Sequence, residues 1–445
     1  MKKILKYPLI FIVVLGVALL SLYLACLFPS DWIKEQLVKS LDVIEENGNY
    51  KMIITAFNKP IMFDTYADTM MMNTAYSIDS EQPFYSLLFA RSNYVPGVSD
   101  KTVTNNATSL QNFPKIMELR RVLQGEKLVA IEYARYWHGY LIFLRPLLTV
   151  FTYMQLRVMS FIIHFLLLGI LLYQIKKKIG TKYWIAVLFG IIAVDAYLVF
   201  ICFEETIGMS LIIIESIVLL SGKIKKVAPY FFIIGMLTAF FDLLTVPVAI
   251  CIFPLLLYVL QENKSFKQLL FSCIKCILLF GIGYLSMWFA KWILVDLIYD
   301  GGIIRNSINQ ILYRTDISNV GIQEGVIQNF RHLGNIVSIF VIALYVINIL
   351  YIAIKSIKEK KISEENKKNL LILALGLAPI VWYSIIREHS LTHGYFTYRN
   401  LIVTCMSAQI VSIHLLDQVV KKNKKEIFTI FVLVNLIVLT LNYML

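Results

Sequence analysis

About 11 long apolar segments divide this chain, and they constrain its fold more than any motif does. They cover residues 7–28, 153–175, 183–202, 206–222, 228–241, 243–261, 269–292, 336–354, 369–386, 400–418 and 427–444. A bilayer core is crossed by about 20 apolar residues in a helix, and lipid offers exposed backbone groups no partner, so spanning segments are helices or closed barrels. The runs are continuous rather than alternating, which excludes a barrel. The sequence therefore predicts an all-α membrane protein with about 11 transmembrane helices.

The composition agrees with a membrane protein. The mean hydropathy is +0.70 and 16% of residues are charged, against about 25% in soluble domains. The net charge of +13 could indicate nucleic-acid binding, but the lysines cluster at the ends of apolar runs, so no nucleic-acid partner is predicted. All six cysteines lie in or beside apolar segments, which argues against a disulfide-bonded outer domain.

The placement of lysines predicts the orientation. Clusters occur near residues 2–6, 176–182, 223–226, 264–267, 355–368 and 421–425, in alternate connections between apolar segments. The other short connections, 203–206, 293–335 and 387–399, contain no lysine. Because basic residues concentrate on the cytoplasmic side, we expect a cytoplasmic N-terminus and an extracytoplasmic loop after the first helix.

Three regions follow from this topology. Residues 1–28 form the first transmembrane helix, which we expect to stay uncleaved because its apolar part exceeds that of a signal peptide and no A-x-A site follows it. Residues 29–152 form a large extracytoplasmic loop with interfacial helices. Residues 153–445 form a helical bundle of about ten spans.

The large loop has its own pattern. Residues 32–44 predict an amphipathic helix along the membrane interface, with Ile33, Leu37, Leu41 and Ile44 at helical spacing. Residues 92–114 are rich in turn formers and predict a surface loop. Residues 115–135 are expected to be helical, and 136–152 to enter the membrane edge as a helix bent near Pro146.

Asp64 and Asp68 are the first candidate site residues. Spaced four apart, they would share one face of a helix. Two neighbouring carboxylates raise the pKa of one of them, which suits a general base or half of a divalent-cation site. The alternative is that Asp64 caps a helix beginning at Thr65 and that Asp68 is solvated.

A second candidate group approaches the membrane at the end of the large loop. Arg135, His138 and Arg145 stand there among aromatic residues. Arginine pairs bidentately with phosphate, so these residues are candidates for binding a phosphate-bearing substrate. An interfacial aromatic belt with snorkelling arginines is an equally strong alternative.

A third group fills the short connection between the ninth and tenth spans. It contains Arg387, His389, His393 and Arg399. The histidines are four apart, which permits zinc binding, but the chain has no H-E-x-x-H motif to support a metal site. Arginine and histidine in one short loop better suit a phosphate or pyrophosphate headgroup, and an ordinary outer loop is the alternative.

A fourth group is scattered along the outer ends of the spans. Asp242 lies between two apolar segments and is either a helix cap or a buried ion-pair partner, the commoner role, of Lys291 or an arginine. Asp242 and Lys291 are included among the candidate binding residues, because placing a polar group at membrane depth costs free energy and often serves a function. Further charged residues on this side are Asp195, Glu204, Glu205, Arg305, Arg314 and Arg331.

The layout of the chain resembles the GT-C superfamily of polytopic membrane glycosyltransferases. The resemblance rests on helix 1, the large outer loop with acidic residues just beyond it, the interfacial helices and about ten further spans. The stretches around Asp64 and Asp68, Arg135 to Tyr140, Asp242 to Pro247 and His389 to Arg399 also resemble a group of bacterial polytopic membrane proteins without a known activity. The superfamily implies a carboxylate in the first outer loop as base or acceptor-orienting group and a polyprenyl-phosphate sugar donor.

These features lead to one hypothesis and two rivals. The hypothesis is an inverting glycosyltransferase on the outer face of a bacterial plasma membrane, acting on a cell-envelope glycan or lipid-linked acceptor. Asp64 or Asp68 would be the base and the cationic residues would bind phosphate; a divalent cation (Mg²⁺ or Mn²⁺) is optional. The rivals are a transporter or flippase of lipid-linked glycans, which the almost purely apolar inner halves of the spans disfavour, and a non-catalytic envelope-assembly protein.

Overall fold

The computed structural model describes residues 6–48, 50–54, 61–94, 114–315, 321–420 and 422–444, and the backbone alone for 50–54 and 61–64. The helices of the first third are α1 (Lys6–Cys26), α2 (Ser30–Asn47), α3 (Thr65–Tyr76), α4 (Pro83–Phe89), α5 (Pro114–Leu123) and α6 (Leu141–Leu148). Two short antiparallel pairs join β1 (Tyr50–Ile54) to β2 (Ile61–Asp64) and β3 (Ser92–Tyr94) to β4 (Val129–Ile131).

The rest of the described chain is helical. Its helices are α7 (Tyr153–Lys178), α8 (Trp184–Ala193), α9 (Ala196–Val199), α10 (Phe203–Leu220), α11 (Val227–Phe241), α12 (Pro247–Gln261), α13 (Phe266–Tyr299), α14 (Ile303–Arg314), α15 (Ile322–Leu333), α16 (Asn335–Lys358), α17 (Glu364–Gly376), α18 (Ala378–Ile385), α19 (Arg387–Thr392), α20 (Gly394–Thr397), α21 (Ile402–Val419) and α22 (Lys424–Met444). The all-helical architecture expected from the apolar runs is confirmed, although the two strand pairs were not expected.

Among the described residues, seven helical segments are long and apolar enough to cross a membrane. They are Lys6–Cys26, Tyr153–Lys178, Phe266–Tyr299, Asn335–Lys358, Glu364–Ile385, Gly394–Val419 and Lys424–Met444. Shorter apolar helices occupy Thr181–Ala193, Val227–Phe241 and Pro247–Gln261. The chain is therefore a multi-pass membrane protein, and every apolar run of the sequence coincides with one or two helices.

The spans differ in how far they are buried by their neighbours. In α21, 72% of the apolar window is buried, whereas the value is 17% in α22 and 22% in α1. Large apolar side chains such as Leu166 of α7, Leu278 of α13 and Ile347 of α16 are mostly exposed. Hence α21 is the centre of the bundle, and the exposed faces of the outer helices are those that lipid covers.

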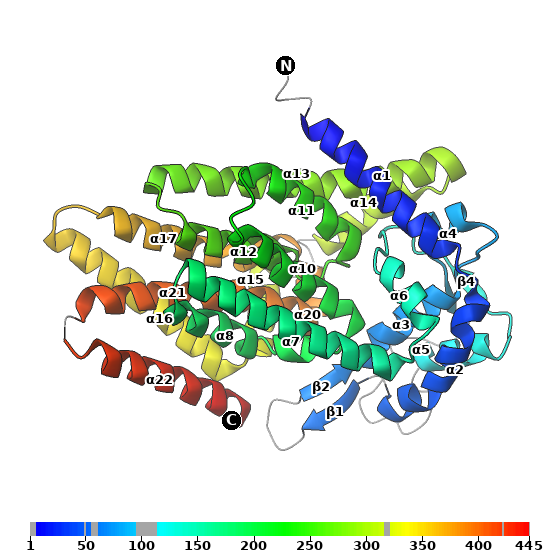
Figure 1. Ribbon diagram of the computed structural model, residues 1–445, viewed down its shortest axis with the longest axis horizontal. Coiled ribbons are helices and arrows are strands. Elements are labelled where there is room, and N and C mark those ends of the chain that lie inside the picture. Colours follow the sequence, from blue (N-terminus) through cyan, green and yellow to red (C-terminus); the bar gives the residue numbers. More distant parts are fainter. Residues whose placement is uncertain are drawn as a thin grey trace.

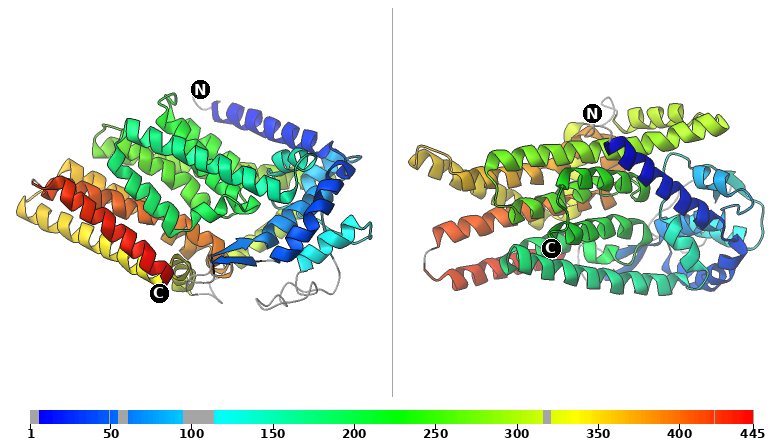
Figure 2. Two further views of the ribbon diagram at one scale, coloured as in Figure 1. Left: turned by 60° about the horizontal axis from the view of Figure 1, so that its bottom comes forward. Right: turned by 45° about the horizontal axis from the view of Figure 1, so that its top comes forward.

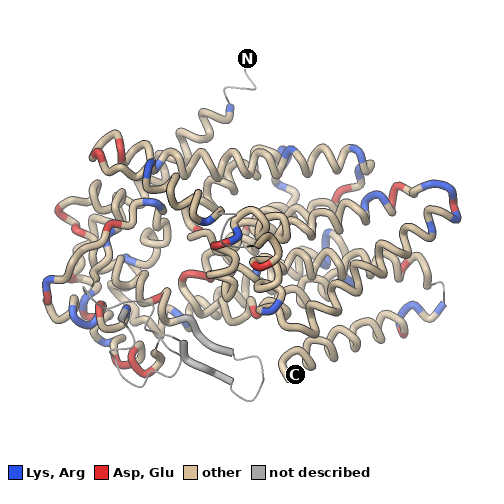
Figure 3. Tube along the Cα trace, turned by 180° about the vertical axis from the view of Figure 1, so that it is seen from behind, with Lys and Arg blue, Asp and Glu red and all other residues tan. Residues whose placement is uncertain are grey.

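The described parts of the 29–152 region gather at one end of the bundle. α2, α3, α4, α5 and α6 lie together beside the second half of α1 (Figure 1), and the two turned views show the same division (Figure 2). The lysine-rich connections α16–α17 and α21–α22 lie at the opposite end (Figure 3). The two kinds of connection that the sequence assigned to opposite sides are thus far apart in space.

This region is not a separate soluble domain. It shares one apolar core with the membrane helices, which includes Leu22 of α1, Ile33 of α2, Met72 of α3, Leu148 of α6 and Met287 of α13. The face of α2 predicted from helical spacing is fully inside this core, since Ile33, Leu37 and Ile44 are 0% exposed and Leu41 is 6% exposed. The helix was expected to lay this face on the membrane interface, but it packs on protein instead.

Three other expectations for the loop need correction or lie outside the structure. The helix expected over 115–135 ends at Leu123, and β4 follows it. The bent helix expected over 136–152 is the shorter α6, with Pro146 inside it. Most of the 92–114 loop lies outside the described residues. The six cysteines are buried free thiols, as their apolar setting indicated.

Two glycines let α11 and α13 touch backbone to backbone. A Cβ on Gly235 would lie 2.0 Å from the carbonyl oxygen of Phe280, and one on Gly283 would lie 2.1 Å from that of Phe232. Small residues allow membrane helices to approach closely where no hydrophobic effect drives them together. α11 and α13 frame part of the core beneath the large loop, so their contact helps to fix the site described below.

Replacing Gly283 with alanine is expected to lower the folded yield and the thermal unfolding temperature. The added methyl collides with backbone, which cannot rotate away as a side chain can, and overpacking of this kind costs about 1–3 kcal/mol or more. Gly281 is the matched control, because it lies on the same helix with open space around its Cβ position. Equal unfolding temperatures for Gly283→Ala and Gly281→Ala in neutral detergent would contradict the close helix contact.

Candidate functional site

A cavity of about 220 Å³ lies where six separate stretches of the chain meet. Its walls are Tyr66, Ala67, Met70, Met71 and Thr74 of α3; Tyr133, Tyr136, His138 and Tyr140 before α6; Glu204 of α10 and Leu243; Arg314 of α14; and His389, His393, Tyr395 and Phe396 around α19 and α20. The stretch after Asp64, the stretch around His138 and the 387–399 connection were separate candidates in the sequence. The structure brings all three to one cavity.

Asp64 ends β2 and immediately precedes α3. Its backbone therefore lies next to the cavity-lining residues Tyr66 and Ala67, while its side chain is outside the described part of the structure. The expectation that Asp64 and Asp68 share one helical face is wrong, because the helix begins at Thr65 and Asp64 belongs to a strand.

Asp68 is completely buried and faces away from the cavity lining. Its Oδ1 accepts the backbone N–H of Phe203 at 2.7 Å, and its Oδ2 accepts the hydroxyl of Tyr153 at 2.8 Å. The guanidinium Nε of Arg157 lies 3.7 Å from Oδ2. Burial raises the pKa of Asp68 to about 6, although Arg157 opposes the shift. The carboxylate therefore joins α3 to the first turn of α10, and this arrangement favours a positioning role over that of a base.

His138 is a buried part of the cavity wall with a left-handed backbone, φ 53°. Its Nε2 lies 3.0 Å from the carbonyl oxygen of Tyr133 and must donate to it, so Nδ1 is the acceptor for the Tyr140 hydroxyl at 3.2 Å. Burial lowers the pKa of His138 to about 3, and Lys291 adds to the shift. His138 is thus a neutral imidazole that orients Tyr140.

The two arginines expected beside His138 do not line the cavity. Arg135 donates to Asn306 Oδ1 at 2.9 Å and lies over the ring of Tyr133. Arg145 is fully buried, and its guanidinium donates to the backbone carbonyls of Ala25, Phe28 and Ala75. These carbonyls lie at the C-terminal ends of α1 and α3, where they have no partner within the helix. Arg145 therefore supplies their hydrogen-bond donors and connects both helix ends to α6.

Asp242 is a helix cap rather than an ion-pair partner. Its carboxylate accepts the backbone N–H of Thr245 at 3.0 Å and of Val246 at 3.4 Å, just before α12. The ion pair that the sequence favoured is absent from the described residues. Lys291 is buried in α13, with Nζ 3.4 Å from the carbonyl oxygen of Leu87 and 5.3 Å from the ring centre of Trp137. Neither residue lines the cavity.

His389 and His393 form the part of the wall contributed by α19 and α20. Their ring centres are 4.7 Å apart. His389 Nε2 lies 3.2 Å from the carbonyl oxygen of Leu244, whereas the buried Nδ1 atoms of both histidines have no hydrogen-bond partner. Burial lowers the pKa of His389 to about 3 and of His393 to about 4, with Arg314 contributing to both shifts. Both rings are therefore neutral at physiological pH.

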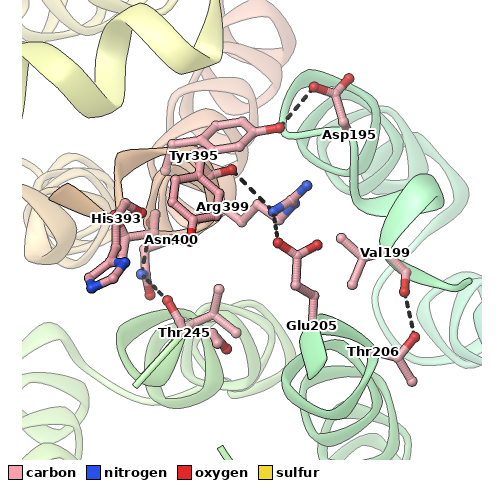
Figure 4. A network of polar contacts seen from close by, with 12 residues as sticks. Asp195, Val199, Glu205, Thr206, Thr245, His393, Tyr395, Arg399 and Asn400 are labelled. Atoms are coloured by element: carbon pink, nitrogen blue, oxygen red, sulfur yellow. Dashed lines mark hydrogen bonds and ion pairs between the residues drawn. The ribbon is translucent and has the colours of Figure 1, made fainter. Parts of the chain in front are cut away.

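The other two residues expected in this connection lie behind the cavity. Arg387 donates to the carbonyl oxygen of Ser384 at 2.9 Å. Arg399 is paired with Glu205 of α10, with 2.5 Å between Nη1 and Oε1 (Figure 4). Tyr398 donates to Asp195 at 2.8 Å in the same network. These contacts hold the cavity-bearing connection against the neighbouring helices.

Glu204 and Arg314 are cavity residues that the sequence did not single out from their neighbours. Glu204 precedes the ion-paired Glu205 and lines the cavity. Arg314 is the last residue of α14 and donates to the Tyr136 hydroxyl at 2.8 Å. An acidic pair at the outer end of a span was the available signal for Glu204. No local signal distinguishes Arg314 from Arg305 and Arg331.

The described residues do not fit a metal centre. No group of three His, Cys, Asp or Glu side chains that could hold a metal ion occurs among them. Glu204 is the carboxylate among the described lining residues, and the same cavity is lined by the cation Arg314, whose charge disfavours a divalent cation. Neither the zinc alternative at His389 and His393 nor a bound Mg²⁺ or Mn²⁺ is supported by this arrangement.

Comparisons with known proteins give no relative for this chain. No family model, no curated protein and no solved structure matches it. The resemblance to GT-C glycosyltransferases therefore stays a prediction, and the functional argument depends on the cavity itself.

Proposed function

We propose that the protein is a membrane glycosyltransferase that moves a sugar from a polyprenyl-phosphate donor to a cell-envelope glycan or lipid-linked acceptor. In this proposal the chain has about 11 spans and a cytoplasmic N-terminus in a bacterial plasma membrane, and the cavity opens on the outer face. The lysine-rich connections at the end opposite to the loop region (Figure 3) support that orientation.

One observation carries the proposal: a single cavity gathers a carboxylate, a guanidinium, several imidazoles and a set of phenols from segments far apart in the sequence. Polar groups in a membrane protein are expensive to bury. Their convergence on one hollow is typical of a substrate site, whereas the buried Arg145 and Asp242 bind backbone groups at helix ends and line no cavity.

The cavity residues match the needs of sugar transfer. The acceptor hydroxyl oxygen would attack the anomeric carbon while the bond from that carbon to the phosphate oxygen breaks, and the electron pair leaves with the lipid phosphate. Glu204 would take the proton of the acceptor hydroxyl, and Asp64 is the second carboxylate candidate. Arg314 would stabilise the charge that develops on the phosphate.

The surroundings of Arg314 suit a donor with a lipid tail. Ser307 is the buried residue of α14, and most apolar side chains on the rest of that helix are exposed. Leu312 and Tyr313, which directly precede Arg314, are 63% and 59% exposed. A helix of this kind lies in the interfacial layer of a membrane. A prenyl tail could therefore lie along α14 in lipid while its phosphate reaches the arginine.

The test is sugar transfer by the purified protein in liposomes. Short polyprenyl-phosphate sugars are supplied, and the polyprenyl phosphate and the glycosylated acceptor are measured. The Asp64→Asn variant is expected to insert normally and to lose at least about tenfold in rate if Asp64 assists the base, while Asp79→Asn, in the same loop, is the control. Failure of the wild-type protein to bind or consume any such donor would overturn the proposal.

A further inference from the structure

The strongest unexplained feature of the cavity is the Nδ1 atom of His389. The side chain is 4% exposed. Since Nε2 lies next to a carbonyl oxygen and donates to it, a neutral ring leaves a lone pair on Nδ1, and that atom is buried without a partner. A buried polar atom without a partner is destabilising, so a ligand that supplies the missing partner would bind more tightly.

His393 repeats the feature one helical turn later. Its Nδ1 is also buried and unpartnered, and its ring is 4.7 Å from that of His389. Both rings line the same cavity as Arg314, which uses one of its guanidinium nitrogens for the Tyr136 hydroxyl. Arg314 is thus a fixed cation beside two imidazoles, each of which can donate a hydrogen bond to an anion once its Nδ1 takes up a proton.

The ligand that fits depends on the protonation of the two rings. A neutral Nδ1 accepts a hydrogen bond, for example from a sugar hydroxyl, whereas a protonated Nδ1 donates one, for example to a phosphate oxygen. Arg314 disfavours a second positive charge in the free protein but attracts an anion. Once an anion is present, its charge favours protonation of the neighbouring rings.

We infer that Arg314, His389 and His393 form an anion site that binds a phosphoryl or sulfuryl group together with uptake of protons by the two histidines. The assignment rests on the proposed function in taking this cavity as the substrate site. It names the phosphate-bearing part of the substrate as the group held at this wall.

The other titratable groups around the two rings include the cavity phenols Tyr66, Tyr136, Tyr140 and Tyr395. Glu204 of α10 lines the same cavity, and His138 and Tyr133 belong to the segment before α6. Glu388 precedes His389 on α19 and raises the pKa of His393. His332 of α15 lies behind Gly394. Since Glu204 repels anions when ionised, an anion is expected to contact the side of the cavity formed by Arg314 and the histidines.

The sign of the pH effect follows from the two states. In the free protein both histidines are neutral above about pH 4. In the complex the anion raises the pKa values of both histidines. Between the pKa values of the free protein and those of the complex, the complex therefore holds more protons than the free protein. Affinity therefore increases as pH falls, and each proton taken up gives up to tenfold per pH unit. We expect at least about tenfold tighter binding at pH 6 than at pH 8.

The experiment is calorimetric titration of the full chain, purified in neutral detergent, at pH 6, 7 and 8. The probes are inorganic sulfate and the sulfate ester of citronellol, whose charges stay constant over this range. Preference for the ester identifies a lipid headgroup as the source of the anion, and equal affinity identifies a free oxyanion; both outcomes support the site. Titration in two buffers with different ionisation heats counts the protons taken up.

Matched variants decide the outcome. His389→Gln and His393→Gln should each flatten the pH dependence, and Arg314→Gln should weaken binding at every pH. The control is His414→Gln, a histidine distant from the cavity whose two nitrogens already pair with Tyr183 and Asn369. Absence of binding for both probes, tighter binding at high pH, or an unchanged pH dependence in the double histidine variant would overturn the inference.

These measurements need no sugar transfer, so the two proposals can fail separately. A pH-dependent anion site in a protein without transferase activity would leave the inference intact and remove the proposed function. Sugar transfer by a protein that binds neither probe would support the proposed function and overturn the inferred anion site.

Discussion

Replacing Glu204 with glutamine is expected to lower the rate of sugar transfer by about 10²–10⁴-fold, the usual contribution of a general base. Glutamine keeps the size of the side chain and its acceptor oxygen but cannot take a proton. Glu204 lines the same cavity as Arg314 and the histidines, so it is the described carboxylate of the cavity that can receive a proton from an acceptor hydroxyl. The measurement is single-turnover transfer from a polyprenyl-phosphate sugar in liposomes.

The control for this variant is Glu132→Gln. Glu132 belongs to the same end of the molecule and accepts from Tyr85 and Arg91, but it is outside the cavity wall. Its replacement should leave the rate within about twofold of the wild type. If Glu204→Gln transfers sugar at the wild-type rate, then Glu204 is not the base and Asp64 becomes the remaining candidate of the proposed mechanism.

Replacing Asp68 with alanine is expected to destabilise the folded protein by about 3–5 kcal/mol, the usual cost of removing one partner of a buried ion pair. The N–H of Phe203 loses its acceptor and the charge of Arg157 loses its carboxylate. The measurement is thermal unfolding in neutral detergent. Asp68→Asn should cost less, because one amide oxygen can still accept from Phe203.

A second substitution separates structure from chemistry at this position. In the double variant Asp68→Ala with Arg157→Leu, no buried charge is left without its partner, so part of the lost stability should return. If Asp68→Ala instead unfolds at the wild-type temperature but loses sugar transfer, then Asp68 acts on the substrate and its role as a positioning residue for the first turn of α10 is wrong.

The sequence predicted which segments form the site better than it predicted the role of each residue there. The stretch after Asp64, the stretch around His138 and the histidines 389 and 393 were all selected as candidates, and all three border the cavity. Selection worked because polar residues stand out against apolar neighbours within a short window of sequence. The same reasoning also selected Arg145 and Asp242, which the structure assigns to helix ends.

Those two residues show why the local signal was insufficient. A buried arginine that satisfies three carbonyls and one that lines a cavity cannot be told apart by their sequence context. The difference between them is the position of backbone acceptors that lie 70 to 120 residues away along the chain, and hydropathy carries no information on the spatial distance to such acceptors. For the same reason Arg314 was not distinguished from the other arginines of its connection.

The sequence by itself determined that this chain crosses a membrane several times as helices, since lipid imposes a length and an apolarity that each segment must meet on its own. It also determined which face of α2 is apolar, because helical periodicity is a local property. The tertiary structure decided which charged groups share a hollow. Asp68 accepts a hydrogen bond from the first residue of α10, 135 residues further along the chain. Glu204, Arg314 and the two histidines instead line one cavity. The difference arises because the pairing of buried polar groups depends on distances in space that no local sequence pattern encodes.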